Sequence, residues 1–139
     1  MVKICKEFKW EMGHRLIEHN LCSNPHGHSY RMQVILESEE TENGMVLDYY
    51  ILGNIVRDII ENFDHSFAVS EKDNLLKSFL EQNNFKMVVL PFDATAENLC
   101  YFLGSIIKEK LQPYKNIKIL TIRLYETRSV YAERSFPIT

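Results

Sequence analysis

The chain has 139 residues, of which 45% are hydrophobic and 25% are charged, and its formal net charge is −3 at pH 7. This length suits one domain with a sizeable core, so we expect a single domain over residues 1–139. The negative charge argues against nucleic acid as the main partner, because phosphate binding usually requires a basic surface. No apolar stretch approaches the roughly 20 residues that a membrane span needs, and residues 1–5 lack the apolar region of a signal peptide. The 3 cysteines are too scattered for a disulfide framework. Together these features lead us to expect a cytoplasmic protein that binds no membrane.

Apolar and polar side chains alternate along residues 2–12, which is typical of a half-buried strand. His14 falls on the apolar face just past the end of this strand. The same period predicts a second strand over residues 26–36, with His26 and His28 on its apolar face. A loop that contains several turn-forming residues connects the two strands.

Apolar residues recur at helical spacing over residues 49–63, over residues 71–82 and again after Thr95. The second of these helices is expected to have Ser70 as its N-cap and four side chains facing inward, namely Leu75, Leu76, Phe79 and Leu80. Two closing strands follow, over residues 116–127 and 130–136. The order of two strands, helices and two strands predicts an α+β fold with an antiparallel sheet.

Three histidines are expected to meet at one end of the first hairpin. If the first two strands pair antiparallel, His14 faces His26 and His28 across the hairpin, and Gly27 leaves room for a close approach. Three histidines and a water molecule form a catalytic zinc site with an open position. The alternative is that these are polar residues at a strand end that bond to the loop. Their convergence on one face favours a Zn²⁺ site.

Cys22 lies in the connecting loop, four residues before His26, and its position allows three interpretations. It could be a small apolar loop residue. It could be a fourth ligand, which would close the site as a structural zinc held by one cysteine and three histidines. It could also be a nucleophile or base whose thiolate form is favoured by the nearby cation. The spacing alone does not choose among these.

Several other polar residues have structural interpretations, and some of them have functional ones as well. Asp64 and His65 follow the first helix, either as ordinary turn residues or as a carboxylate that orients a general base. Thr95 suits a helix N-cap and Glu97 suits the first turn of that helix. Glu126 falls on an apolar strand face, where a carboxylate needs hydrogen-bond donors that a ligand could supply.

Taken together, these residues resemble the 6-pyruvoyl-tetrahydropterin synthase and 6-carboxy-tetrahydropterin synthase family. The matching groups occur in family order along almost the whole chain, at Phe8 and at residues 14–16, 22–28, 44–48, 64–65, 95–98 and 125–127. The chain departs from the family pattern at two places near these motifs. Met12 and Gly13 precede His14 where many relatives have two alanines, and the segment 67–92 is longer than in compact members.

The resemblance implies a tunnelling fold, in which trimers close a barrel and two trimers usually stack into a homohexamer with active sites between subunits. It assigns Zn²⁺ to the three histidines, and it makes Cys22, Asp64 and His65 the catalytic group. Glu126 would grip the pterin ring, and the motif at Thr95 and Glu97 would belong to the substrate-binding residues.

The spacing of Cys22 and the following histidines resembles the carboxy-tetrahydropterin branch. The implied activity is a zinc-dependent carbon–carbon lyase of queuosine (7-deazaguanine) biosynthesis. It would convert 7,8-dihydroneopterin triphosphate to 6-carboxy-5,6,7,8-tetrahydropterin and release acetaldehyde and triphosphate. One alternative is a 6-pyruvoyl-tetrahydropterin synthase of biopterin synthesis, and another is a non-catalytic domain with a structural zinc.

Overall fold

The computed structural model describes residues 1–138. Along the chain, its elements are β1 (Val2–His14), β2 (His26–Ser38), α1 (Tyr49–Ile60), β3 (Ser66–Ser70), α2 (Asn74–Gln82), β4 (Met87–Leu90), α3 (Ala96–Leu111), β5 (Ile117–Tyr125) and β6 (Tyr131–Pro137). The strands of this described part form one sheet in the order β4-β3-β1-β2-β5-β6. No helix within residues 1–138 is long and apolar enough to cross a membrane.

The predicted hairpin is the centre of the sheet. β1 and β2 pair antiparallel over their whole length, with Met12 opposite His28 and His14 opposite His26. The alternation seen in the sequence matches burial, since Trp10, Met12 and Tyr30 are buried and their neighbours are more exposed. β5 and β6 extend the sheet from β2 in the antiparallel sense, as predicted for the closing strands.

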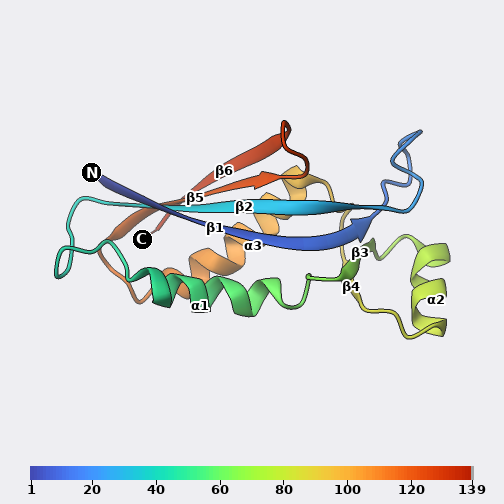
Figure 1. Ribbon diagram of the computed structural model, residues 1–139, viewed down its shortest axis with the longest axis horizontal. Helices are drawn as coiled ribbons and strands as arrows, with labels where there is room; N and C mark the ends of the chain where they lie inside the picture. Colours follow the sequence, from blue (N-terminus) through green and yellow to red (C-terminus); the bar gives the residue numbers. More distant parts are fainter. Residues whose placement is uncertain (139) are drawn as a thin grey trace.

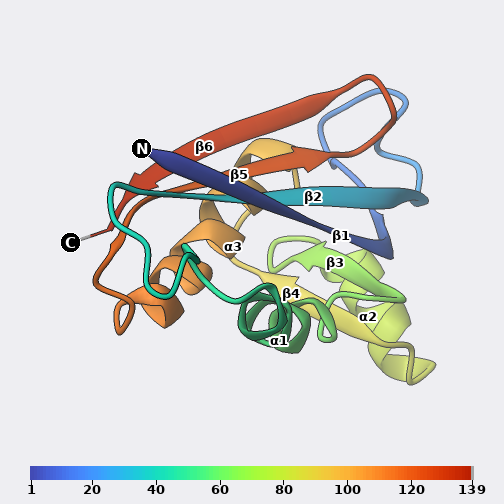
Figure 2. The same ribbon diagram turned by 60° about the vertical axis from the view of Figure 1, so that its left-hand side comes forward.

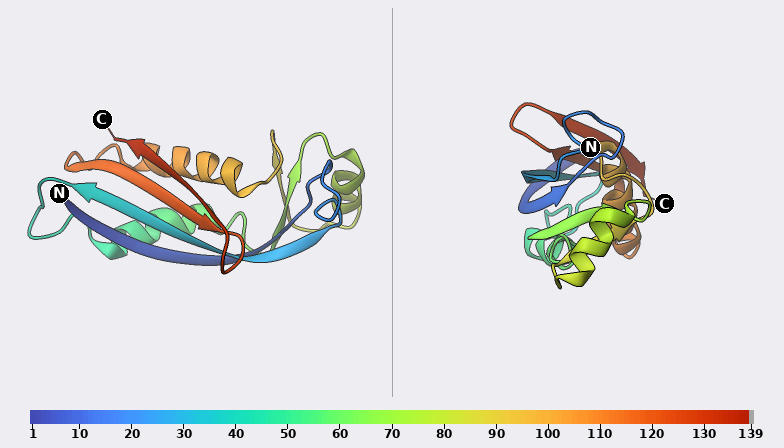
Figure 3. Two further views of the ribbon diagram at one scale, coloured as in Figure 1. Left: turned by 90° about the horizontal axis from the view of Figure 1, so that it is seen from above. Right: turned by 90° about the vertical axis from the view of Figure 1, so that its right-hand side faces the viewer.

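α1 and α3 lie on one side of the sheet and cover its apolar face (Figure 1, Figure 3). The core between these layers contains the fully buried side chains of Tyr30, Leu52, Leu103 and Leu120. Both chain termini lie at one end of the molecule, whereas α2 and the loop of residues 15–25 lie at the other (Figure 1, Figure 2). The predicted metal ligands lie towards this second end (Figure 1), because His14 ends β1 and His26 begins β2.

Two strands were not predicted, and they make the sheet mixed instead of purely antiparallel. β3 runs parallel to the end of β1, with Ser66 opposite Met12 and Phe67 opposite Gly13, and β4 runs parallel to β3. These strands have only 5 and 4 residues, and the central residues of β3 do not alternate in burial. Short strands without alternation carry little signal of their own.

The second helix differs from the prediction at its start and in the face that it buries. It begins at Asn74 with Asp73 as its N-cap, because Ser70 ends β3. Leu76 and Leu80 are buried against β3, whereas the expected inward residues Leu75 and Phe79 are 76% and 54% exposed. A helix of 9 residues packed on one short strand buries a narrow stripe, and the adjacent apolar positions remain outside it.

The contact between β3 and β1 accounts for glycine at position 13. A Cβ atom at Gly13 would lie 2.7 Å from Cε2 of Phe67, so any larger residue would collide with that ring. Phe67 belongs to the lengthened segment, and glycine at position 13 is what allows the ring to pack on β1.

Candidate active site

The three histidines converge as the sequence predicts. One ring nitrogen from each of His14, His26 and His28 lies within 4.8 Å of the others. The Nε2 atoms of His14 and His26 are 3.2 Å apart, and the ring centroids of His14 and His28 are 5.0 Å apart. The register of the β1–β2 hairpin causes this convergence, because it places His26 opposite His14 and His28 two residues further along the same face.

The second ring nitrogens of two of these histidines show that the cluster suits a metal ion. Nδ1 of His14 lies 2.8 Å from the carbonyl oxygen of Ala94, and Nδ1 of His26 lies 2.7 Å from that of Asn24. A carbonyl only accepts, so each Nδ1 carries the hydrogen and each Nε2 presents a lone pair. Two lone pairs at 3.2 Å repel each other unless a cation lies between them. Neutral imidazoles oriented by carbonyls in this way are typical of zinc ligands.

Burial favours the neutral form of two of these imidazoles, those of His14 and His28. It lowers the pKa of His14 and of His28, although the charge of Glu126 acts in the opposite direction on both. A lowered pKa preserves the unprotonated ring, which is the form that binds metal, to lower pH. Tyr30 closes the inner side of the cluster with its hydroxyl 3.4 Å from Nδ1 of His14, and burial raises the pKa of this hydroxyl, so it stays protonated.

Glu126 lies beside the histidine cluster but not on a strand face. β5 ends at Tyr125, and Oε1 of Glu126 is 3.6 Å from Nε2 of His14. The expectation of a buried carboxylate on an apolar face is wrong, because this side chain lies past the end of the strand and is 23% exposed. The structure instead places the carboxylate at the edge of the cluster, where a bound ligand can reach it.

The start of α3 also adjoins the cluster. Ala94, whose carbonyl accepts the bond from His14, is followed by Thr95, the N-cap of α3. The hydroxyl of Thr95 accepts the backbone N–H of Asn98 at 3.1 Å, and Glu97 is exposed in the first helical turn. The structural interpretations of both residues are therefore satisfied, and their backbone segment lies next to the metal ligands.

Cys22 is held in a loop that is closed by its own hydrogen bonds. Its carbonyl accepts from the N–H of Leu16 at 2.7 Å, and its N–H donates to Nδ1 of His19 at 3.1 Å. Among the described residues, Cys22 is not a member of the group of potential ligands formed by the histidines. This arrangement argues against a fourth, sulfur ligand and leaves the thiol free.

Asp64 and His65 form a dyad at the outer edge of β1. Nδ1 of His65 lies 2.9 Å from Oδ1 of Asp64, and the same carboxylate oxygen accepts the backbone N–H of Glu11 at 3.0 Å. That bond from Glu11, followed by the bond from His65, lowers the pKa of Asp64, so the carboxylate stays ionised and orients the ring. His65 has a left-handed backbone (φ 57°), which is uncommon outside glycine and marks functional sites. Its side chain is 77% exposed.

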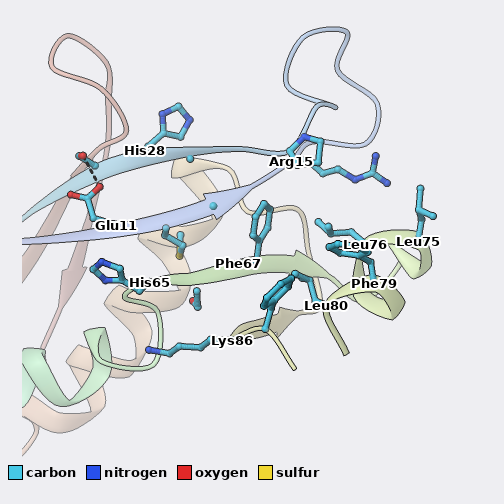
Figure 4. Close-up of a pocket in the computed structure, with 17 residues that line it drawn as sticks. Glu11, Arg15, His28, His65, Phe67, Leu75, Leu76, Phe79, Leu80 and Lys86 are labelled. Carbon is cyan, nitrogen blue, oxygen red and sulfur yellow. Dashed lines mark hydrogen bonds between the residues drawn. The ribbon is translucent and has the colours of Figure 1, made fainter. Parts of the chain in front are cut away.

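A cleft of about 910 Å³ opens between this end of the sheet and α2. Its walls are mainly apolar, with Phe67, Leu76, Phe79 and Leu80 directed into it (Figure 4). His65 and Lys86 lie at one end of the cleft, and Arg15 lies on the side of α2 (Figure 4). The sequence did not reveal the cleft, because β3, which contributes Ser66 and Phe67 to its lining, was not recognised as a strand.

Several contributors to the site leave no trace in the sequence. The carbonyl groups of Asn24 and Ala94 orient two ligands, and every residue type carries a carbonyl. Tyr30 could have been found from the alternation, because it follows His26 and His28 on the same face of β2.

Comparison with known proteins places the chain in a family. The model of the family described as 6-pyruvoyl tetrahydropterin synthase matches residues 3–135. A relative from Haemophilus influenzae is 34% identical over 142 residues, which cover 96% of this chain and 98% of that protein. A relative from Rickettsia conorii is 31% identical over 137 residues, which cover 96% of this chain and 99% of that protein. Both relatives are named 6-carboxy-5,6,7,8-tetrahydropterin synthase.

Solved structures confirm the expected tunnelling fold. An uncharacterized protein from Wolinella succinogenes superposes with a TM-score of 0.84 at 24% identity, covering 96% of this chain and 97% of that one. The 6-pyruvoyl tetrahydropterin synthase from Plasmodium vivax superposes with a TM-score of 0.81 at 17% identity, covering 99% and 98%. The match of almost the whole chain to the family model and to these relatives shows that it belongs to the 6-pyruvoyl tetrahydropterin synthase family and is an enzyme of that family.

Proposed function

We propose that the chain is a zinc-dependent carbon–carbon lyase that acts on 7,8-dihydroneopterin triphosphate. The products would be 6-carboxy-5,6,7,8-tetrahydropterin, acetaldehyde and triphosphate, and the reaction would serve queuosine (7-deazaguanine) biosynthesis. The observation that carries this proposal is the convergence of three histidines, two of them oriented by carbonyls, in a chain whose relatives are named 6-carboxy-5,6,7,8-tetrahydropterin synthase.

His14, His26 and His28 would hold the zinc ion through ring nitrogens and leave a coordination position open. When bound there, zinc acidifies hydroxyl groups of the substrate side chain that reach it. Glu126 would bind the pterin ring, because one carboxylate can accept both the ring N–H and the 2-amino group. The position of Glu126 at the edge of the cluster supports this role. We assign Thr95 and Glu97 to substrate binding as well, because α3 begins beside the ligands.

Cys22, Asp64 and His65 would move the protons. Because Nδ1 of His65 is bonded to Asp64, its Nε2 is free to take a proton from the substrate, and the carboxylate stabilises the cationic ring that results. The thiol of Cys22 would act as the second base or nucleophile, since it lies in the loop that leads to His26 and is not among the potential metal ligands.

The dyad and the histidine cluster of one chain are separated along β1. Asp64 binds the backbone at Glu11, three residues before His14, which corresponds to about 10 Å of strand, whereas His28 is nearer because it lies opposite Met12. Direct proton transfer requires contact at about 3 Å. Because the side chain of His65 is also 77% exposed, we propose that the dyad of one subunit serves a substrate held by the histidines of another. This requires a homo-oligomer, either a trimer or a dimer of trimers.

Product analysis after incubation with 7,8-dihydroneopterin triphosphate tests the activity. We expect 6-carboxy-5,6,7,8-tetrahydropterin and one acetaldehyde for each product molecule. Formation of 6-pyruvoyl-tetrahydropterin without acetaldehyde would instead assign the synthase of biopterin synthesis.

Metal analysis and X-ray absorption test the zinc site. We expect about one zinc per chain, with three nitrogen ligands and an oxygen ligand. A sulfur ligand would assign the structural zinc held by Cys22 and the three histidines and would remove Cys22 from catalysis.

A further inference from the structure

The segment that contains β3, α2 and β4 (residues 66–90) contacts both halves of the proposed catalytic group. Asp73, at the start of α2, binds the base of the Cys22 loop, and Lys86, just before β4, binds the turn that carries Asp64 and His65. These two contacts come from opposite ends of one small unit, whose own core is formed by Val69, Leu76 and Leu80.

The contact of Asp73 with Arg15 is a partly buried, bidentate ion pair. Nε and Nη2 of Arg15 donate to the two carboxylate oxygens at 2.6 Å and 2.7 Å. The side chain of Asp73 is only 3% exposed and that of Arg15 is 18% exposed. The hydrogen bonds from Arg15, with that from the N–H of Leu76, lower the pKa of Asp73, so the carboxylate stays charged. Paired and partly buried groups of this kind hold one geometry better than an exposed pair does.

Arg15 connects this ion pair to the loop that carries Cys22. Its third nitrogen, Nη1, donates to the carbonyl of Ser23 at 3.3 Å, next to Cys22. The remaining hydrogen bonds of the loop are internal or involve its flanking histidine, His26. Within residues 1–138, the pair of Arg15 and Asp73 is thus the hydrogen-bonded link between this loop and elements outside the β1–β2 hairpin. The orientation of the loop relative to the metal ligands depends on that link.

Lys86 holds the other half of the catalytic group. Its Nζ donates to the carbonyl of Asp64 at 2.6 Å and to that of Glu61 at 2.7 Å. Glu61 is the C-cap of α1, so the ammonium group also neutralises part of the negative charge at the C-terminal end of the helix dipole. The turn from Glu61 to His65 includes the left-handed residue, and Lys86 binds its backbone directly before that residue.

We propose that Asp73 and Lys86 are positioning residues, through which the segment of residues 66–90 holds the Cys22 loop and the Asp64–His65 dyad in their reactive places. Neither side chain needs to touch the substrate. This inference rests on the proposed function, in which Cys22, Asp64 and His65 carry out the chemistry.

Replacing Asp73 by asparagine tests the first contact without removing the helix cap. Asparagine caps helices as well as aspartate does, but it cannot form the charged, bidentate pair. We expect Asp73→Asn to raise the alkylation rate of Cys22 by iodoacetamide about tenfold relative to that of the exposed Cys5, read by peptide mass spectrometry. We expect kcat to fall by about tenfold or more with KM little changed, because a misplaced group affects the chemical step.

Matched variants separate this effect from capping and from general instability. Asp48→Asn alters the N-cap of α1, which has no arginine partner, and should leave both readouts unchanged. Arg15→Lys keeps the positive charge but cannot donate two parallel hydrogen bonds to the carboxylate, so it should have the same effects as Asp73→Asn. The double variant should be no worse than the worse single variant, because both remove the same contact. An unchanged ratio of Cys22 to Cys5 labelling in folded Asp73→Asn, or a changed ratio with normal kcat, would overturn the role of Asp73.

Lys86 is tested by loss and rescue. Lys86→Met removes both donated bonds and should lower kcat about tenfold at nearly constant KM, whereas Lys86→Arg should recover most of the activity. The exposed Lys72 is on the same segment and has no side-chain partner among the described residues, so Lys72→Met is the control. Equal activity of Lys86→Met and Lys72→Met would overturn the role of Lys86.

A failure of the proposed function gives a different result. Wild-type protein would then show no turnover of dihydroneopterin triphosphate, yet the labelling ratio of Cys22 to Cys5 would still decide whether Asp73 holds the loop.

Discussion

His14 and Arg15 are neighbours in sequence, and each holds a different part of the site. His14 is 1% exposed and contributes its Nε2 to the metal cluster, whereas Arg15 reaches the carboxylate of Asp73. At this scale the chemistry depends on which nitrogen carries a hydrogen and which carboxylate is charged. Backbone carbonyls fix the hydrogen on Nδ1 of His14 and of His26, and Arg15 keeps the carboxylate of Asp73 charged.

Glu126→Gln tests whether the cluster is part of a pterin site. The carboxylate can accept two adjacent donors of the pterin, whereas glutamine presents one acceptor and one opposing donor. We expect pterin binding to weaken by about 2–3 kcal/mol, as for a lost charge-assisted pair. Calorimetric titration with a pterin product measures this change.

The same variant also changes the charge beside the metal ligands, since Oε1 of Glu126 is 3.6 Å from Nε2 of His14. We expect zinc affinity to fall as well, because the carboxylate charge attracts the cation that the histidines would bind. Glu109→Gln, an exposed position on α3, should alter neither affinity. Unchanged pterin binding in Glu126→Gln would mean that Glu126 has a structural role only.

At the scale of the elements, α3 and α1 each contain a glycine, but the two have different surroundings. A Cβ at Gly104 of α3 would collide with the ring of Phe136 on β6, and that ring is itself buried. A Cβ at Gly53 of α1 would meet only the flexible ends of Arg57 and Lys6, at 2.9 Å and 3.2 Å.

We therefore expect Gly104→Ala to destabilise the protein by about 1–3 kcal/mol, despite the higher helix propensity of alanine. Gly53→Ala should be neutral or stabilise it by up to about 1 kcal/mol, because the flexible side chains can move aside. Thermal unfolding at equal protein concentration compares the two variants. Equal midpoints would show that the packing of α3 on β6 is looser than the structure indicates.

The cap of α2 gives a pH-dependent prediction. The pKa of Asp73 is lowered in the folded protein, so its stabilising effect is complete above the unfolded value of about 3.9 and is lost as pH falls through the folded value. We expect Asp73→Asn to be less stable than wild type by about 1.5–3 kcal/mol at neutral pH. This difference should shrink progressively below about pH 4. Urea unfolding at pH 7, 5 and 3 measures it, and a difference independent of pH would contradict the assignment of the ion pair.

At the scale of the whole molecule, the histidine cluster and the Asp64–His65 dyad take different positions relative to β1. The histidine cluster lies on the side covered by α3, and the dyad lies at the outer edge with His65 directed towards solvent. In the proposed function, the dyad of one chain therefore serves the histidine cluster of another.

Mixing two inactive variants tests whether copies of the chain complete each other. Cys22→Ala and His65→Ala should each be inactive alone. If sites are shared between subunits, random reassembly of an equal mixture should restore about a quarter of the sites. Activity measured after co-refolding decides the matter. A mixture that stays inactive, while co-refolded wild type recovers, would place each complete site within one chain.

Local patterns in the sequence were sufficient for the core of the fold and for the metal ligands. Alternation with a period of two located β1 and β2 and put His14, His26 and His28 on one face, because that period is a property of the extended backbone itself. The family and its tunnelling fold were likewise recognised from motifs along the chain and are confirmed by the comparisons. The roles of individual residues remain proposals.

Only the tertiary structure decided what surrounds these ligands. The parallel strands β3 and β4 are too short to show a period, and Leu75 and Phe79 follow the helical pattern yet stay outside the core, at the cleft. The pairing of Arg15 with Asp73 joins residues 58 positions apart, and the carbonyl of Ala94 meets His14 across 80 positions. Such contacts depend on how elements pack and on backbone groups common to all residues. No local pattern encodes them.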